Sequence, residues 1–317
     1  TSHLYEQCKK LDNLTIKEHW TMVDLLTKDN CCYGVVVRKD DGSLDTITAN
    51  YTVLACGGIG GIYRYSTNYR HLTGDGIAVA IKHGVELKNV NYVQIHPTTF
   101  YTKKHEDRSF LISESVRGEG AKLLDKNMNR FVDELLPRDV LTGKIREQMK
   151  KDGTDFVWED LRTIPRDELV SHFPNIIEHC KEMGYDVFKE PIPVVPAQHY
   201  FMGGVKVNHH SRTSMECLYA VGETACNGVH GRNRLASNSL LESLVFAKRA
   251  AGQMAELGFV NDEIAAKKAA DSIDLADYSD EKAVEREYRK LAMEAIEGRT
   301  SVDAEETVES GIAYIQA

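Results

Sequence analysis

The stretch Gly222-Glu223, followed by His230-Gly-Arg-Asn-Arg-Leu-Ala-Ser-Asn-Ser-Leu-Leu-Glu242, decides the fold of this chain of 317 residues. The apolar run at 218–221 is typical of a short buried strand that ends at Gly222. After the polar loop, residues 237–239 offer capping side chains, and apolar residues then repeat with helical spacing. Such a strand and helix present backbone N–H groups and a positive dipole end to an anion or an electron-rich ring.

The loop between this strand and this helix is crowded with cationic donors. Arg232 and Arg234 both lie close to His230 in the sequence. An ordinary turn with a good helix cap would explain the pattern without any ligand. Crowded arginines are costly, however, unless an anionic group lies among them. The loop therefore favours an anion-binding site at the end of the strand.

The motif Gly-Glu…His-Gly-x-Asn-Arg-x-x-x-Asn-Ser-Leu-Leu resembles the flavoprotein family of L-aspartate oxidase, succinate dehydrogenase and fumarate reductase. The form at 233–242 is most similar to the L-aspartate oxidases, because the other subunits more often carry Gly-Ala before the Asn and Asp after the leucines. The resemblance covers residues 1–250, with several motifs in family order. It implies FAD as cofactor and oxidation of L-aspartate to iminoaspartate in NAD biosynthesis, with oxygen or fumarate as electron acceptor.

Composition sets broad limits on the class of protein. A hydrophobic content of 42% and a charged content of 27% are typical of a soluble globular protein with room for two domains. The net charge of −9 argues against nucleic-acid binding, whereas a local basic pocket would suit a small dicarboxylate. Apolar runs are far shorter than a membrane span and no signal peptide opens the chain, so we expect a cytoplasmic protein. The seven cysteines include no C-x-x-C pair, which argues against a metal site or a disulfide framework.

A glycine cluster follows the predicted strand at 51–56. Gly57-Gly-Ile-Gly-Gly61 is not a dinucleotide fingerprint, because Tyr63 stands where the third glycine is needed. A flexible strand exit is the simple alternative. In the family, Ala-x-Gly-Gly closes over the flavin, and a Gly-Asp-Gly motif, here at 74–76, precedes a helix, here at 77–83. The resemblance therefore assigns Gly57, Gly58 and Asp75 to the cofactor.

The family's opening βαβ unit, whose G-x-G-x-x-G binds the ADP half of FAD, has no counterpart in this sequence. A diverged protein that has lost the unit would explain this. We instead expect a fragment of a longer protein, because the downstream motifs keep their catalytic residue types. Such a chain would bind FAD weakly on its own.

Three local patterns in the middle of the chain each have an ordinary explanation. His96 follows a strand at 90–95, Glu114 and Arg117 stand three apart, and Arg138 follows a proline at a helix start. Each could be a satisfied histidine or a surface ion pair. Together with Ala197-Gln-His199-Tyr-Phe-Met-Gly-Gly204, they are similar to the family's substrate site, in the same order.

The resemblance implies a role for each of these residues. The substrate carboxylates would be held by His96, Ser113, His199 and Arg234. Arg138 would lie over the substrate carbon opposite the flavin, with Glu114 and Arg117 as its proton relay, since arginine alone is a poor general acid. Glu223 would bind ribityl hydroxyls, and the flavin ring would meet Asn238, Ser239 and Leu240. Position 113 departs from the Thr that is frequent in the family, and Arg232 stands where Ala is common.

We predict an α/β fold in which a Rossmann-like FAD-binding domain, N-terminally incomplete, spans 1–90 and 205–252. An α+β substrate-capping domain at 91–204 interrupts it, and a helical region with solvated faces follows at 253–317. Further elements expected are strands at 15–29, 33–38 and 45–50, helices at 144–151, 165–183 and 278–298, a hairpin at 125–129 and a stiff connector at 191–196.

Two other functions stay open. One is the flavoprotein subunit of a succinate or fumarate enzyme, and the other is a non-catalytic fragment that binds a dicarboxylate without flavin. The expected ligand is L-aspartate, fumarate or succinate, with quinolinate synthase as a downstream partner in the pathway.

Overall fold

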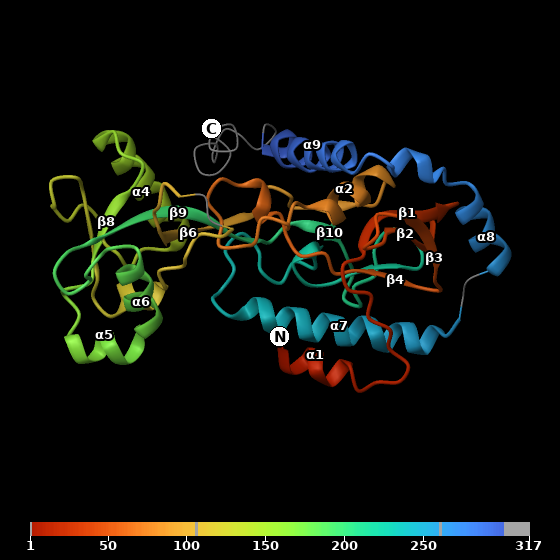
Figure 1. Ribbon diagram of the computed structural model, residues 1–317, viewed down its shortest axis with the longest axis horizontal. Helices are drawn as coiled ribbons and strands as arrows, with labels where there is room; N and C mark the ends of the chain where they lie inside the picture. Colours follow the sequence, from red (N-terminus) through yellow and green to blue (C-terminus); the bar gives the residue numbers. More distant parts are fainter. Residues whose placement is uncertain (1, 105–106, 260–261, 301–317) are drawn as a thin grey trace.

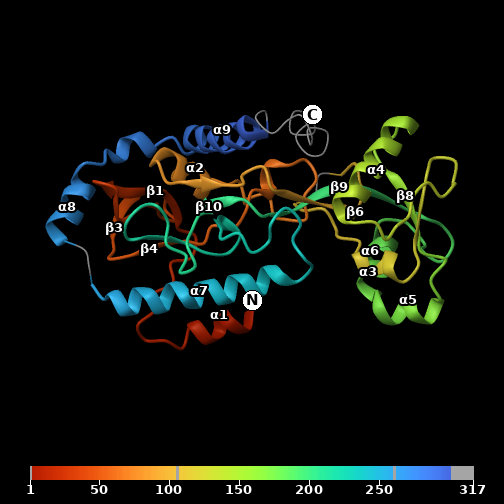
Figure 2. The ribbon, with the colours of Figure 1, turned by 180° about the vertical axis from the view of Figure 1, so that it is seen from behind.

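A computed structural model describes residues 2–104, 107–259 and 262–300. The chain forms a mixed α/β fold with two lobes side by side, and two long strands extend from one lobe into the other (Figure 1). The view from behind shows the same division (Figure 2). In the part of the chain that the structure describes, no helix is long and apolar enough to cross a membrane.

The first lobe begins with a helix and an antiparallel sheet. A turn at 40–42 joins the second and third strands, and the first strand starts at Thr21 and not at residue 15 as predicted. Thr21 pairs with Arg38, the last residue of the second strand, so the residues before Thr21 have no partner strand. These elements are α1 (Ser2–Cys8), β1 (Thr21–Lys28), β2 (Cys31–Arg38) and β3 (Leu44–Thr48).

The strand before the glycine cluster and the strand before Gly222 lie side by side. β4 (Thr52–Leu54) pairs in parallel with β11 (Leu218–Ala220), so both predicted strands are confirmed, although each is short. Val53 is 39% exposed, and β4 is therefore buried on one face only. Around this pair lie η1 (Gly60–Ile62), α2 (Asp75–Lys82), β5 (Leu87–Lys88), β10 (Gly204–Lys206), η2 (Gly222–Thr224), β12 (Ala225–Cys226) and α7 (Asn238–Leu257).

The second lobe is built on an antiparallel sheet in the order β6-β9-β8-β7. The expected connector at 191–196 is wrong, because these residues begin β9, in the interior of the sheet. Pro196 is tolerated there since it sits where the β6–β9 register shifts, so its missing N–H costs no ladder bond. The strands are β6 (Val93–Phe100), β7 (Lys122–Leu124), β8 (Val157–Asp160) and β9 (Ile192–Phe201).

The helices of the second lobe depart from the predicted lengths at prolines. The single helix expected at 165–183 is broken at Phe173, because the residue before a proline disfavours the helical region. The hairpin turn at 125–129 is confirmed by the Asp125 N to Asn129 O hydrogen bond of 2.9 Å. The helices are α3 (Glu114–Gly118), α4 (Arg138–Asp152), α5 (Arg166–His172) and α6 (Pro174–Glu182).

The C-terminal region does not have solvated faces throughout. It contains α8 (Glu263–Asp271), η3 (Leu275–Tyr278) and α9 (Glu281–Thr300), and α9 packs along α2. Tyr288 and Ile296 of α9 are buried, and the Tyr288 hydroxyl donates to the carbonyl oxygen of Val23 over 2.8 Å. Residues 301–317 of the predicted helical region lie outside the described residues.

Each lobe has its own hydrophobic core. One cluster joins β1, β2, α2 and β11 with α9, and the other joins β7, β8 and β9 with α4, α5 and α6. The assignment of these parts to a flavin domain and a capping domain stays a prediction.

Candidate active site

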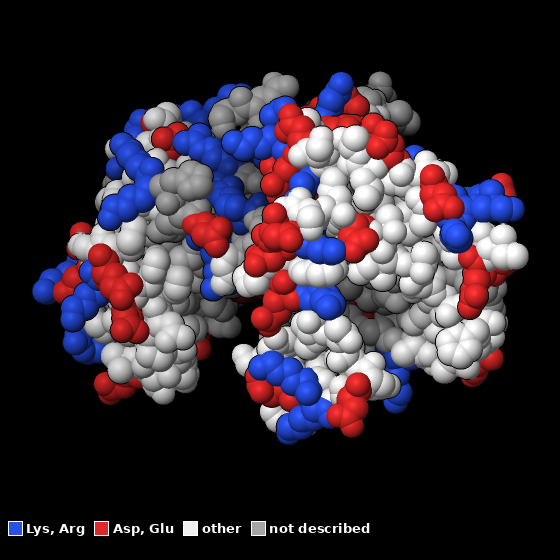
Figure 3. Space-filling model, turned by 45° about the vertical axis from the view of Figure 1, so that its right-hand side comes forward, with Lys and Arg blue, Asp and Glu red and all other residues white. Residues whose placement is uncertain are grey.

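A cleft runs between the lobes, and Figure 3 shows the surface hollowed there. One part of the cleft is lined from the second lobe and the other part from the strand end at η2 and the start of α7. His199 and Arg234 line both parts. The structure thus brings together all seven residues predicted for substrate and catalysis: His96, Ser113, Glu114, Arg117, Arg138, His199 and Arg234.

Arg138 is the first residue of α4, directly after Pro137, which fixes the helix start. Its Nε donates to Glu114 Oε2 over 3.0 Å, and its Nη1 donates to Gln94 Oε1 over 3.0 Å. The Arg138 side chain is 10% exposed, whereas that of Glu114 is 48% exposed. Glu114 therefore lies between the sheltered guanidinium and solvent.

Gln94 is a site residue that the sequence prediction missed. It is 4% exposed on β6, and besides accepting from Arg138 it donates through Nε2 to Asn233 Oδ1 over 3.0 Å and to the Arg234 carbonyl over 2.9 Å. A glutamine at a buried position of a strand needs partners for its amide, and this was the available signal. Gln94 links the two arginines of the cleft.

His96 and His199 lie on the paired strands β6 and β9. Their ring centroids are 5.3 Å apart, with one ring edge toward the other. His96 Nδ1 is 2.9 Å from the Thr98 carbonyl, and His199 Nδ1 is 2.7 Å from Thr67 Oγ1. Burial, aided by Arg234 and Arg138, lowers the pKa of His199 to about 4. Burial also holds the pKa of His96 well below its usual range. Both rings are therefore neutral at pH 7.

Arg234 and Arg117 are buried guanidinium groups with unused donors. Arg234 is 5% exposed and stacks over Tyr200, and its Nε has no hydrogen-bond partner within the described chain. Arg117 is 3% exposed and donates Nη1 to the Glu134 carbonyl over 3.0 Å, while Nε and Nη2 lack partners among the described residues. An anion in the cleft would satisfy Arg234, because buried donors without acceptors are costly. The remaining predicted contact, Ser113, caps α3 by accepting from Ser115 N over 3.3 Å.

The predicted cofactor residues gather at η2. Glu223 Oε1 accepts from Phe201 N over 2.8 Å, and burial raises the pKa of Glu223 to about 7. A Cβ at Gly58 would lie 2.4 Å from Glu223 Oε1, so a larger residue there would displace this carboxyl. Gly57 has a φ of +76° and accepts at its carbonyl from Thr224 Oγ1 over 2.9 Å. Asp75, at the start of α2, accepts from Thr73 Oγ1 over 2.8 Å.

The start of α7 completes this part of the cleft, with one correction. Ser237 has a φ of +67°, and its side chain makes no capping hydrogen bond, so the predicted serine cap is wrong at this residue. Asn238 and Ser239 are the first helical residues, and Ser239 lines the cleft beside Glu223. Leu240 is 74% exposed and is not among the cleft residues.

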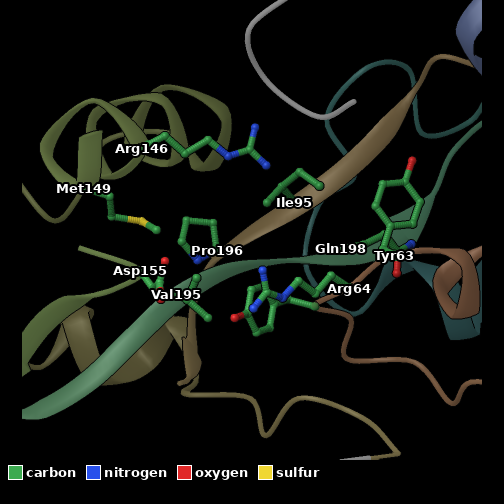
Figure 4. A pocket seen from close by; sticks show the side chains of 10 residues that line it. Tyr63, Arg64, Ile95, Arg146, Met149, Asp155, Val195, Pro196 and Gln198 are labelled. Atoms are coloured by element: carbon green, nitrogen blue, oxygen red, sulfur yellow. The ribbon is translucent and has the colours of Figure 1, made fainter. Parts of the chain in front are cut away.

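A second cavity lies behind the paired strands (Figure 4). Ile95 and Val195 line it from β6 and β9, and Arg146 and Met149 line it from α4. Ile95 alternates with Gln94 and His96 on the strand, so it points to the opposite face. No predicted site residue lines this cavity. Among the described residues, no group of three or more His, Cys, Asp and Glu side chains could hold a metal ion.

The fold and the cleft together define a flavoprotein-type α/β protein, and comparison agrees. The family model for the FAD binding domain matches residues 2–240, and the chain belongs to this family. It is 55% identical over 248 residues to an L-aspartate oxidase of Clostridium perfringens, covering 78% of this chain and 56% of that protein. It is 50% identical to an L-aspartate oxidase of Clostridium acetobutylicum, over 78% of this chain and 57% of that protein. The chain thus spans about half the length of the curated relatives it matches.

Solved structures lead to the same class. A quinol-fumarate reductase with menaquinol molecules has a TM-score of 0.71 and 34% identity, over 83% of this chain and 49% of that one. An Escherichia coli quinol fumarate reductase chain has a TM-score of 0.76 and 28% identity, over 99% of this chain and 62% of that one. The family resemblance predicted from the sequence is confirmed.

Proposed function

We propose that this protein is an L-aspartate oxidase, which oxidises L-aspartate to iminoaspartate with FAD and passes the electrons to oxygen or fumarate. The observation that carries the proposal is the pair Arg138 and Arg234, two sheltered guanidinium groups that line one cleft and are linked through Gln94. The C. perfringens relative, 55% identical, supports the choice of substrate.

The charge of the cleft suits a dicarboxylate. Arg117, Arg138 and Arg234 line it together with two carboxylates, Glu114 and Glu134, and the two histidines are neutral. Glu134 is already paired with Lys122 and Arg130. Arg234 offers its unused Nε to one carboxylate, because a bidentate contact with a guanidinium is the strongest available. His199, His96 and Ser113 add neutral donors that orient the substrate without adding charge.

The residues at η2 fit a flavin. When bound, FAD supplies the acceptor for the hydride that leaves the substrate carbon. Gly57 and Gly58 allow the Leu72 and Glu223 side chains to pack against the backbone, and Asp75 and Glu223 offer carboxylates for hydroxyl groups. Asn238, Ser239 and Leu240 present the N-terminus of α7, whose positive dipole end favours electron density on the ring.

Arg138 and Glu114 move the proton. When fumarate is the acceptor, one carbon takes a hydride and the Arg138 guanidinium donates a proton to the other. Glu114, bonded to Arg138 over 3.0 Å and half exposed, returns the proton from solvent. Arg117 lines the same part of the cleft, and its charge interacts with those of Glu114 and Arg138.

A succinate dehydrogenase or fumarate reductase flavoprotein is the second candidate, favoured by the TM-score of 0.76 to a fumarate reductase chain. A flavin-free dicarboxylate-binding protein is the third. A cytoplasmic location, and delivery of iminoaspartate to quinolinate synthase, belong to the first proposal.

Anaerobic reduction of the FAD-loaded protein separates the three functions. Bleaching of the flavin absorbance by L-aspartate, and not by succinate, is the result expected for an L-aspartate oxidase. Bleaching by succinate alone would support the second candidate. Succinate binding measured by calorimetry, with no flavin retained at any FAD concentration, would support the third.

A further inference from the structure

Glu159 is an acid in the middle of the second lobe's core. It lies on β8 between Leu123 of β7 and Ile192 of β9, both fully buried. Glu159 is itself 0% exposed, and both of its carboxyl oxygens lack a hydrogen-bond partner in the described chain. Burying a carboxyl without partners costs free energy, which indicates that Glu159 has a functional role.

The compensating charge for Glu159 belongs to Arg117. Arg117 donates to the Glu134 carbonyl, Glu134 accepts from Leu123 N, and Leu123 is the cross-strand neighbour of Glu159. Of the charged groups that act on Arg117, Glu159 acts most strongly, and Arg117 is the cation that acts on Glu159. No hydrogen bond joins the two among the described residues, and Arg117 Nε and Nη2 have no partner there. Both groups are therefore held close enough to interact electrostatically without forming a neutral pair.

Arg117 connects Glu159 to the cleft. Its side chain lines the cleft together with Glu114 and Arg138, and it interacts with the charges of both. Glu159 does not line the cleft itself. Any change in its charge reaches a bound anion through Arg117.

Burial and a second carboxylate oppose the ionisation of Glu159. Glu134, in the turn after β7, carries a negative charge that Arg130 holds with bonds of 3.0 and 2.8 Å. Cys180 of α6 is a buried thiol whose pKa is raised by burial and by Glu159. Burial raises the pKa of Glu159 to about 8 against the lowering effect of Arg117. Glu159 is therefore protonated at neutral pH.

We infer that Glu159 is a positioning residue for dicarboxylate binding, because its charge state sets the net charge of the Arg117 side of the cleft. With a proton on Glu159, the positive charge of Arg117 is available to the anion. When the proton leaves, the new carboxylate cancels that charge and the anion binds less tightly. The inference rests on the proposed function, since it takes the cleft to bind a dicarboxylate.

Succinate titration by calorimetry, from about pH 6 to about pH 10, tests this dependence in the whole chain. In the wild type, affinity should fall on the order of fivefold across the ionisation of Glu159. Glu159→Gln keeps the shape and cannot ionise, so it should lack the part of the fall that Glu159 causes. The ionisation of Glu223, with a pKa of about 7, is common to both proteins. Glu168→Gln, an exposed acid on α5 of the same lobe, is the matched control and should follow the wild type.

An equal fall in Glu159→Gln and wild type would overturn the inference while leaving dicarboxylate binding in place. No succinate binding at any pH in the wild type would instead overturn the proposed function. Glu159→Met, of similar volume, provides a second variant if Glu159→Gln does not fold.

Infrared spectroscopy with ¹³C-labelled glutamate tests the charge of Glu159 without a ligand. A carboxylic acid band that is present at pH 6, lost near pH 8 and missing from a Glu159 variant is expected. A Glu159 that is ionised already at pH 6 would overturn the inference.

Discussion

The first lobe and the cleft each contain a buried cluster of charged groups, and the two clusters differ in how many of their polar atoms have hydrogen-bond partners. In the first lobe, Asp24 is 0% exposed and accepts from Lys82 Nζ over 2.8 Å, from His83 Nε2 over 2.6 Å and from the Tyr278 hydroxyl. In the cleft, Arg117, Arg234 and the nearby Glu159 keep buried atoms without partners in the described chain.

This difference separates a structural cluster from a binding cluster. A buried network that is fully satisfied rigidifies the fold, and the Asp24 cluster joins β1, α2 and η3 in this way. Buried donors without acceptors cost free energy in the unliganded protein and are retained where a ligand completes them. We therefore expect substitutions in the first cluster to change stability and substitutions in the second to change binding and turnover.

The largest effect is expected for Asp24→Ala. It removes the acceptor for three buried or half-buried donors and should lower the free energy of unfolding by about 3–5 kcal/mol. Urea unfolding measures this, with Asp45→Ala as the control, since Asp45 forms a half-exposed pair with Lys39 worth about 0–1 kcal/mol. Equal losses in the two variants would contradict a structural role for the Asp24 cluster.

The Asp24 cluster also affects how the free energy of unfolding changes at acid pH. Burial raises the pKa of Asp24, but hydrogen bonds from His83, Lys82 and Tyr278 outweigh it and lower the pKa to about 2. Because the folded value lies below the ordinary 3.8, the stabilisation is present above about pH 4 and is lost as the pH falls toward 2. Asp24→Asn should lose this part of the acid transition, and an unchanged transition would count against the cluster.

In the cleft, Arg138→Leu should lower turnover with L-aspartate and fumarate by at least ~10²-fold, about 2.7 kcal/mol, because the proton donor is lost. Dicarboxylate affinity should change far less. Lys150→Leu removes an exposed cation from the same helix and serves as the control in steady-state assays. Turnover equal to wild type in the FAD-loaded protein would remove Arg138 from the mechanism.

A smaller loss, about 2 kcal/mol of succinate binding, is expected for Arg234→Ala and for His199→Ala. Each variant removes one donor from the anion while the fold keeps its other contacts. Calorimetry measures the affinity, and Arg212→Ala, a half-exposed arginine of the first lobe, is the control. If both variants bind as the wild type does, the substrate lies elsewhere.

The smallest effect concerns the cofactor side of the cleft. Glu223→Gln keeps the acceptor for Phe201 N but replaces the second carboxyl oxygen, so FAD should bind about fivefold more weakly, about 1 kcal/mol. Quenching of flavin fluorescence measures the affinity. Glu216→Gln, at an exposed position before β11, should leave it unchanged. A loss of the same size in Glu216→Gln would mean that Glu223 has no particular contact with FAD.

Residue types and their order predicted the lining of the cleft better than they predicted its internal bonds. His96 and Arg138 could be found because each stands beside a proline, and His199 because it lies in a motif of the family. His96 lies within β6, however, and does not follow a strand as predicted. Gln94 and Glu159 could not be assigned, because their importance depends on partners that are distant in sequence.

Errors in the predicted elements have equally local causes. The sequence did not predict the strand through Pro193 and Pro196 because proline disfavours a ladder, and the register shift shows how Pro196 is tolerated. Ser237 fails as a cap because its backbone is left-handed, which the sequence does not reveal. The break at Phe173 was not predicted either, although Pro174 alone is enough to explain it.

Gln94 couples the opening of the cleft to the alignment of Arg138 and Arg234. One side-chain amide holds the Arg138 guanidinium through its oxygen and the Arg234 backbone through its nitrogen. Separation of the lobes must therefore break a bond to Gln94 before the arginines can move apart. Conversely, once that amide is bonded at both ends, one residue of β6 sets the position of the Arg138 guanidinium relative to the Arg234 backbone. The cleft therefore selects ligands by their length as well as by their charge.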